Sequence, residues 1–284
     1  MFCVCRDGSL KLIEIATKKI IRTYEGHKVN VIKKTPCGKK LIIGSKDGSI
    51  KILNSENGDC IKIIDFSQNN VGVENIFITN NNTFLSLLFC DEKYKLFNLH
   101  DYACIQTFSF EVTDSLDVSN EKMVTIKWDQ DVENYNKICI IDVNTGLCLK
   151  TIEDKDLSVT KIISNELIAT GSENGDIKIW NLKTGDCLKT MKGHTGSIFS
   201  IIKLTHEKIA SCARRTIIIW NFNSGELLKL FEFISNISIF DKIENGKKII
   251  IFDEDEKTIK FFDIENEYMS IIKDKIDCVD IELY

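Results

Sequence analysis

The sequence predicts an all-β fold that repeats one turn-and-strand unit along the chain. The stretch Asp7–Leu12 recurs almost unchanged as Asp47–Ile52, 40 residues later, and again as Asn174–Ile179 after about three more such periods. Each copy combines a tight Asp-Gly or Asn-Gly turn with alternating residues typical of a β-strand. A second turn motif, Gly-x-Cys followed by an aliphatic residue and Lys, occurs at residues 58–62, 146–150 and 185–189. The unit therefore contains at least two turn-linked strands in fixed register.

The strands group into seven units, one of which is assembled from both ends of the chain. Residues 2–25 hold three strands, Phe2–Cys5, Ser9–Ile15 and Ile20–Tyr24, and lack a first strand. The final segment, Ile276–Tyr284, repeats the apolar spacing of the first strands elsewhere. We therefore expect the terminal strands to share one unit and to close the array into a ring. The units cover residues 276–284 with 1–25, 28–66, 71–109, 111–153, 156–192, 195–232 and 233–273.

The unit at residues 111–153 fits the repeat least well. Its first strand, near Ser115–Val118, alternates poorly, and its second turn, Asp129–Asn136, is long and polar. A six-unit ring with an inserted hairpin is therefore the alternative arrangement.

Composition indicates one globular domain over residues 1–284. The chain is 43% hydrophobic and 28% charged and has a single proline, so it can bury a large core and shows no linker. The net charge of −5 comes from interspersed acids and lysines, which argues against a nucleic-acid partner. No stretch resembles a signal peptide or a membrane span. We expect a cytoplasmic protein, with the nucleus as the alternative compartment.

The cysteines follow the repeat. Their number, eleven, is odd, and Cys60, Cys104, Cys148 and Cys187 occupy one repeat position in different units. Equivalent positions in a closed array lie far apart, so these residues cannot pair with each other. We interpret them as small buried hydrophobic residues.

The stretch Leu167–His194 resembles the WD40 repeat family, and the resemblance extends over essentially the whole chain. Its best-matching segments are Thr170–Gly175, Ile177–Asn181 and Thr184–Thr190, followed by Gly193 and His194. The resemblance implies a seven-bladed β-propeller of four-stranded antiparallel blades. The family's Trp-Asp dipeptide is eroded and reads Ile13-Glu14, Leu53-Asn54, Phe97-Asn98, Ile141-Asp142, Trp180-Asn181, Trp220-Asn221 and Phe262-Asp263.

The resemblance also implies structural roles for residues of a hydrogen-bond network that links a loop His, a second-strand Ser or Thr, a turn Asp and the third-strand Trp. The candidates are His27 and Asp47 in one unit, Thr170, Asn174 and Trp180 in another, and His194 and Trp220 in a third. In the unit of His27 and Asp47, the second-strand and third-strand positions of the network hold the apolar residues Ile43 and Leu53. In the unit of His194, the second-strand and turn positions hold Ala210 and Arg214. We therefore expect no complete network.

No catalytic constellation is evident, so we predict that the protein is not an enzyme and holds no metal or cofactor. His27 and His194 have structural positions, while His100 and His206 lie in separate turns. The pair Cys3 and Cys5 shares one strand face and fits packing. The acidic turn Asp253–Glu256 lacks the glycine and closing glutamate of a calcium loop, and we interpret it as solvated.

The rim of the propeller is the expected partner-binding surface, because partners of the resembled family commonly dock there. The candidates on it are Phe199, Lys46, Arg6, Glu173, Arg214 and Arg215, with Asn30 and Thr160 at positions like that of Phe199. The two adjacent arginines could receive an acidic or phosphorylated peptide. Pairing with Asp253–Glu256 within the chain is the favoured interpretation.

These observations predict a non-enzymatic scaffold or adaptor that binds other proteins or peptides within a multiprotein complex. By itself the protein is expected to be monomeric. A substrate-recognition subunit of a ubiquitin ligase is one alternative; no F-box-like helical segment precedes the repeats, so the adaptor would be a separate chain. An enzyme or small-molecule binder that uses the central channel is the alternative of another class. An RNA-binding ring is disfavoured by the charge.

Overall fold

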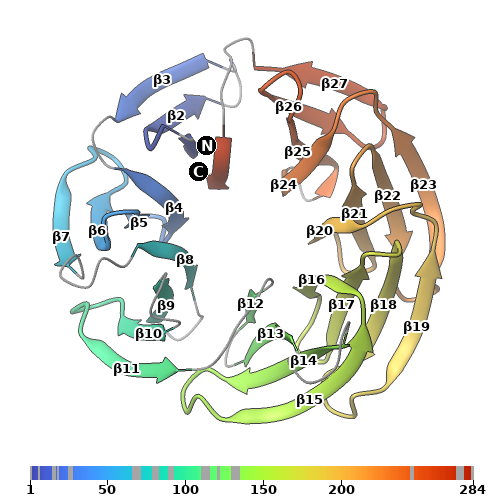
Figure 1. Ribbon diagram of the computed structural model, residues 1–284. Coiled ribbons are helices and arrows are strands. Elements are labelled where there is room, and N and C mark those ends of the chain that lie inside the picture. The colour runs from blue at the N-terminus through green and yellow to red at the C-terminus, as the bar shows by residue number, and fades with distance from the viewer. Residues whose placement is uncertain are drawn as a thin grey trace. The chain divides into compact units, whose positions relative to one another are not determined.

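The computed structural model describes residues 2–5, 7–14, 17, 19–24, 28–65, 72–78, 83–88, 93–109, 116–119, 122–128, 135–243, 246–272 and 278–282. Its elements with defined bounds are β-strands, numbered β1 to β28 in chain order (Figure 1). Within this part of the chain, no helix has the length and apolar character needed to cross a membrane. The all-β prediction is confirmed.

The first of two compact units comprises Met1–Glu111 and Ile272–Tyr284. It contains three four-stranded antiparallel sheets, which we call blades. The blades are β28 (Cys278–Glu282), β1 (Phe2–Cys5), β2 (Leu10–Glu14) and β3 (Lys19–Tyr24); β4 (Val29–Lys34), β5 (Lys40–Ser45), β6 (Ser49–Asn54) and β7 (Cys60–Asp65); and β8 (Val73–Ile78), β9 (Thr83–Leu88), β10 (Lys93–Asn98) and β11 (Cys104–Ser109).

The second compact unit, Val112–Ile271, contains four such blades. They are β12 (Leu116–Ser119), β13 (Lys122–Trp128), β14 (Tyr135–Asp142) and β15 (Cys148–Lys155); β16 (Leu157–Ile162), β17 (Leu167–Ser172), β18 (Asp176–Asn181) and β19 (Cys187–Lys192); β20 (Ile198–Lys203), β21 (Lys208–Ala213), β22 (Thr216–Asn221) and β23 (Glu226–Glu232); and β24 (Ile237–Ile243), β25 (Lys248–Asp253), β26 (Thr258–Asp263) and β27 (Tyr268–Ile271). Each unit is thus a propeller arrangement of small antiparallel sheets.

The two ends of the chain meet in one blade of the first unit. Strand β28 pairs antiparallel with β1, with Cys3 opposite Ile281 and Val4 opposite Asp280. Figure 1 shows the red C-terminal strand beside the blue N-terminal strand. This is the pairing predicted from the missing first strand of residues 2–25.

The repeated Asp-Gly and Asn-Gly motif forms the turn between the second and third strands of a blade. The Oδ1 atoms of Asp7, Asp47 and Asn174 accept the backbone N–H two residues later, at 2.8, 3.0 and 3.0 Å. The following glycines have positive φ, which disfavours other residues. At Gly175 a Cβ atom would also lie 2.5 Å from the carbonyl oxygen of His194. The repeat is therefore preserved because turn geometry and close packing both require it.

The eroded Trp-Asp positions have kept their turn-forming part. The residue after the Trp position accepts hydrogen bonds with its side-chain oxygen. The donors are backbone N–H groups of the turn that follows. Asn181, for example, accepts from Lys183 at 2.8 Å and from Thr184 at 3.0 Å, and Asp263 does the same for Glu265 and Asn266. An amide oxygen accepts such bonds as a carboxylate does. Replacement of Asp by Asn therefore preserves the turn.

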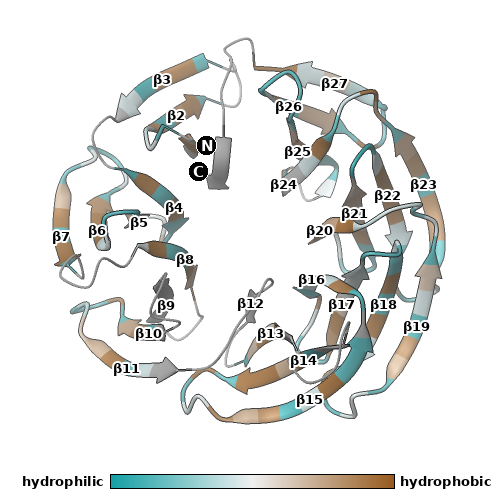
Figure 2. Ribbon diagram, viewed as in Figure 1, coloured by the Kyte–Doolittle hydropathy of each residue, from teal (hydrophilic) through white to brown (hydrophobic). Residues whose placement is uncertain are grey.

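The hydrophobic core lies between successive blades within each unit. In the first unit one apolar cluster includes Ile43 and Leu53, which are both buried, so the predicted apolar replacement of a polar pair is confirmed. In the second unit three clusters lie between its four blades. Figure 2 shows brown apolar segments on β21 and β22, the middle strands of their blade. Ile217, Ile218 and Ile219 of β22 are buried. Burial of these aliphatic side chains is the main stabilising contribution.

The interpretation of the repeated cysteines as buried residues is wrong. Cys60, Cys104, Cys148 and Cys187 are exposed free thiols at the first position of the outer strands β7, β11, β15 and β19. Each thiol donates to the carbonyl oxygen two residues later, at 3.4–3.7 Å. The outer strand of a blade has no neighbouring strand on one side, so a repeat position there need not be buried.

Candidate functional site

The blade β20–β23 contains a buried polar network centred on Ser211. The Ser211 Oγ atom accepts a hydrogen bond from Trp220 Nε1 at 2.8 Å and lies 2.6 Å from His194 Nε2. The other ring nitrogen of His194, Nδ1, lies 2.8 Å from Thr216 Oγ1. The side chains of Ser211 and Trp220 are almost completely buried. The network therefore joins the loop before the blade to its second and third strands.

The expectation that Ala210 occupies the second-strand position of this network is wrong. Thr170 and Trp180, which share a hydrogen bond, lie ten positions apart in the sequence. Ser211 and Trp220, which share the corresponding hydrogen bond, lie nine positions apart. The difference arises because β21 and β22 are joined by a tight turn in which Ala213 pairs directly with Thr216. Thr216 takes the place of the turn Asp. Thr170 and Ser211 are each the third residue from the end of the second strand, β17 or β21, so counting back from the strand end finds Ser211.

His194 is uncharged at neutral pH. Burial lowers the pKa of its imidazole from the usual 6.5 to about 4, because the charged form is poorly solvated in the interior. A neutral imidazole has one N–H donor and one acceptor nitrogen, which matches its two hydroxyl partners. The network is therefore satisfied in this protonation state.

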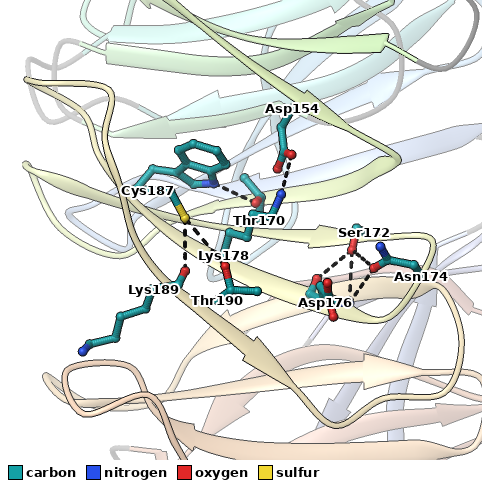
Figure 3. A network of polar contacts seen from close by, with 10 residues as sticks. Asp154, Thr170, Ser172, Asn174, Asp176, Lys178, Cys187, Lys189 and Thr190 are labelled. Carbon is teal, nitrogen blue, oxygen red and sulfur yellow. Dashed lines mark hydrogen bonds and ion pairs between the residues drawn. The ribbon is translucent and has the colours of Figure 1, made fainter.

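The blade β16–β19 has a smaller network, shown in Figure 3. Trp180 Nε1 donates to Thr170 Oγ1 at 2.9 Å. Asn174 Oδ1 instead accepts from the Ser172 hydroxyl at 2.6 Å and supports the turn. Lys178 on the third strand forms an ion pair with Asp154 of the preceding blade. These contacts stabilise the blade and its junction with β12–β15, so they are structural.

The acidic turn after β25 is held by a lysine of its own blade. Lys260 Nζ lies 2.7 Å from Asp253 Oδ2 and 2.7 Å from Glu256 Oε2. Burial alone would lower the pKa of Lys260, but the hydrogen bonds to the two carboxylates outweigh it and raise this pKa. The interpretation of the whole turn as solvated is therefore wrong for Asp253, which is 2% exposed.

The favoured pairing of Arg214 and Arg215 with this acidic turn does not occur. Within the described residues, neither guanidinium group makes a hydrogen bond or an ion pair, and both side chains are exposed. Lys260 occupies the carboxylates of Asp253 and Glu256 instead. Both arginines thus remain available to a ligand.

Phe199 occupies a β-bulge in the innermost strand of its blade. Ile198 pairs with Ala213 and Ser200 with Cys212, which leaves Phe199 as the extra residue. Bulges of this kind redirect a side chain out of the regular alternation, and Phe199 is 48% exposed. The equivalent bulge residues Asn30 and Ser158 are polar and bond to backbone oxygens of the next blade. Thr160, which was expected to correspond to Phe199, is buried.

Ile234, which the sequence does not single out, is the most exposed of the large hydrophobic side chains in the described residues, at 93%. Its loop lies directly beside the arginine turn, because Phe233 N–H donates to Arg215 O at 2.8 Å and Ile237 N–H to Arg214 O at 2.9 Å. Phe199 flanks the same turn through the pairing of Ile198 with Ala213. Two exposed apolar residues therefore flank two arginines.

Two further rim candidates, Glu173 and Lys46, lie in turns of other blades. Glu173 is exposed in the turn after β17, and its N–H donates to Asp156 O at 2.7 Å. Lys46 is exposed in the first unit, next to the Asp47 turn, and its N–H donates to Lys28 O. Arg6 and His27 lie outside the described residues.

The described part of the chain contains no group of three His, Cys, Asp or Glu residues that could hold a metal ion. His100 and His206 are exposed and lie in different units. Fold and site together define a propeller-type repeat protein whose notable surface is a rim with apolar and cationic side chains.

Comparison with known families gives the same class of protein. Residues 4–79 match the family described as the anaphase-promoting complex subunit 4 WD40 domain. Residues 146–181 and 185–221 match the family described as WD domain, G-beta repeat. The chain belongs to the WD40 repeat family.

Curated relatives are distant and longer than the matched regions. Mitochondrial division protein 1 of Candida glabrata is 23% identical over 207 residues, which is 69% of this chain and 26% of that protein. Myosin heavy chain kinase C of Dictyostelium discoideum is 33% identical over 60 residues, covering 21% of this chain and 8% of the kinase. The U5 small nuclear ribonucleoprotein 40 kDa protein of the same organism is 26% identical over 105 residues, covering 35% and 29%. The chain thus spans less than a third of each of these relatives.

Proposed function

We propose that this chain is a non-enzymatic scaffold that binds other proteins through the propeller rim. The observation that carries the proposal is the group formed by Phe199, Arg214, Arg215 and Ile234. Its apolar side chains are exposed on hydrogen-bonded backbone, and its guanidinium groups have no partner within the described residues. Exposed aromatic and arginine side chains on a rigid support are the usual anchors of protein interfaces. WD40 proteins in general mediate protein–protein interaction.

The scaffold that we propose is a single domain, a seven-bladed ring closed by the pairing of β28 with β1. The seven four-stranded sheets of the described residues support this arrangement, as does the antiparallel pairing of the terminal strands. Such closure removes the exposed seam that an open array of blades would have.

The partners are other proteins or peptides, and the chain acts within a multiprotein complex while being monomeric by itself. One relative is named as a ribonucleoprotein component, and the translation initiation factor 3 subunit I of Neurospora crassa is 31% identical over 87 residues. These names describe subunits of assemblies and support the proposal by similarity.

We place the protein inside the cell, in the cytoplasm. The exposed thiols of Cys60, Cys104, Cys148 and Cys187 support a reducing compartment, because such thiols are kept reduced there.

Affinity purification with quantitative mass spectrometry tests the proposal. We expect Phe199→Ala to lose partners that the wild type retains. Leu188→Ala is the matched control, because Leu188 has a similar exposure of 50% but lies on the outer strand β19. Lys46→Glu tests the first unit in the same way. If neither Phe199→Ala nor Lys46→Glu changes the partner list, or if the control loses the same proteins, binding through the rim is refuted.

A further inference from the structure

The loop that carries Ile234 holds this side chain in solvent by tight backbone contacts. Phe233 and Ile237 donate their N–H groups to the arginine turn on one side. On the other side, Asn236 N–H donates to Asp255 Oδ2 at 3.2 Å, and Glu254 N–H donates to Asn236 O at 2.9 Å. The backbone that carries Ile234 is already ordered by these hydrogen bonds. Binding through this side chain therefore costs little further backbone conformational entropy.

Charge of opposite sign lies on the two sides of Ile234. Arg214 and Arg215 lie on the β21–β22 turn and have no side-chain partner in the described residues. On the β25–β26 turn, Asp253 and Glu256 are occupied by Lys260, and Asp255 accepts from Asn236. Glu254 is exposed there and makes no side-chain contact within the described chain.

Backbone hydrogen bonds fix the order of these groups. Phe199 flanks the arginine turn, the arginine turn contacts the Ile234 loop, and that loop contacts Glu254. We call the surface formed by Phe199, Arg214, Arg215, Ile234 and Glu254 the rim ridge. All five residues belong to the second compact unit. The ridge therefore has a cationic part, an apolar centre and an anionic end.

We propose that the rim ridge binds an extended segment of a partner protein in which an apolar residue stands between acidic residues and a basic residue. The acidic residues pair with Arg214 and Arg215, the apolar residue covers Ile234, and the basic residue faces Glu254. This inference rests on the proposed scaffold function and specifies the chemistry of its partner. Complementary charges across an interface mainly set specificity and register.

Glu254 distinguishes this partner from other ligands of an arginine pair. A uniformly anionic ligand, such as a nucleic acid or an acidic membrane surface, would meet repulsion from Glu254 and from the exposed carboxylate of Asp255. A nucleic-acid backbone would also leave the exposed apolar side chain of Ile234 without an apolar partner. A segment of mixed charge satisfies both ends of the ridge.

Selection from a displayed library of random peptides on the full-length protein tests the proposal. We expect enriched peptides to carry acidic residues on one side of an apolar residue and a basic residue on the other. In fluorescence anisotropy, Ile234→Ser should weaken binding of a selected peptide at least about tenfold, the effect of a hot-spot residue. Leu188→Ser on β19 is the matched control and should leave binding unchanged.

Charge reversal identifies the pairing and does not depend on the isoleucine. Arg214→Glu with Arg215→Glu should weaken binding of the selected peptide, and a peptide with Lys in place of its acidic residues should restore it. Glu254→Lys should favour a peptide whose basic residue is replaced by Glu. All variants lie on the surface, and their circular dichroism should match that of the wild type.

Several results would overturn the ridge proposal. These are the absence of enrichment over the Ile234→Ser variant, enrichment of uniformly acidic peptides, or equal binding to the charge-reversed protein. If these results occur while Phe199→Ala still loses cellular partners, the scaffold function stands and only the partner chemistry is wrong. If the partner list is also unchanged, both proposals fail.

Discussion

Replacement of Ser211 by Ala tests whether one hydroxyl stabilises the blade β20–β23. The Ser211 hydroxyl is the only described hydrogen-bond partner of Trp220 Nε1 and of His194 Nε2. Ser211 is 0% exposed and Trp220 1% exposed, so water cannot replace the hydroxyl without a rearrangement. The substitution removes very little volume, so the lost hydrogen bonds dominate its effect.

The expected loss of stability follows from the groups left without partners. A buried donor or acceptor that loses its partner costs about 1–3 kcal/mol. Two groups lose their partner here, but His194 keeps its contact with Thr216 at 2.8 Å. We therefore expect the free energy of unfolding to fall by about 4 kcal/mol, which is about 2 kcal/mol, the middle of the range, for each of the two groups. Thr170→Val, which leaves only Trp180 Nε1 unpaired, should cost about half as much.

Urea denaturation followed by tryptophan fluorescence measures this effect. All three tryptophans, at positions 128, 180 and 220, belong to the second compact unit, so the signal reports on that unit. Thr195→Ala, at an exposed position in the loop that carries His194, is the control and should change stability by less than about 0.5 kcal/mol. A Ser211→Ala variant as stable as this control would refute the reasoning.

Three further outcomes are expected. Lowering the pH from 6.5 to 4 should destabilise the wild type by up to about 3 kcal/mol through His194, because the unfolded imidazole takes up a proton near pH 6.5 and the native one only near pH 4. Denaturation at several pH values should show a smaller dependence of the free energy of unfolding on pH for His194→Gln. An unchanged dependence would contradict the prediction. Lys260→Met should lower the free energy of unfolding by about 3–5 kcal/mol because it leaves the buried Asp253 carboxylate unpaired. In thermal unfolding, the double variant Lys260→Met, Asp253→Asn should recover part of this stability. No recovery would exclude the unpaired charge as the cause. Deletion of Ile276–Tyr284 should abolish hydrogen-exchange protection in β1, whose partner β28 is then missing; retained protection would refute the importance of that pairing.

The sequence predicted the features that depend on neighbouring residues. Turn chemistry and strand alternation repeat along the chain, and they led to the blades and to the pairing of the terminal strands. The turn residues Asp47 and Asn174 act through backbone atoms two residues away. Such interactions are local, so a motif in the sequence is sufficient to identify them.

The tertiary structure decided which distant side chains meet. One residue less between β21 and β22 places Ser211 rather than Ala210 beside Trp220, and sequence spacing alone gave the wrong partner. The repeated cysteines are exposed because no neighbouring strand lies beyond each outer strand. Ile234 is exposed because hydrogen bonds hold its loop between two turns. Likewise Lys260, and neither arginine, pairs with Asp253, because a buried carboxylate is neutralised by the cation that strand register brings within reach. The sequence by itself thus determined the repeating framework, whereas packing between strands and loops decided which side chains remain exposed for a partner.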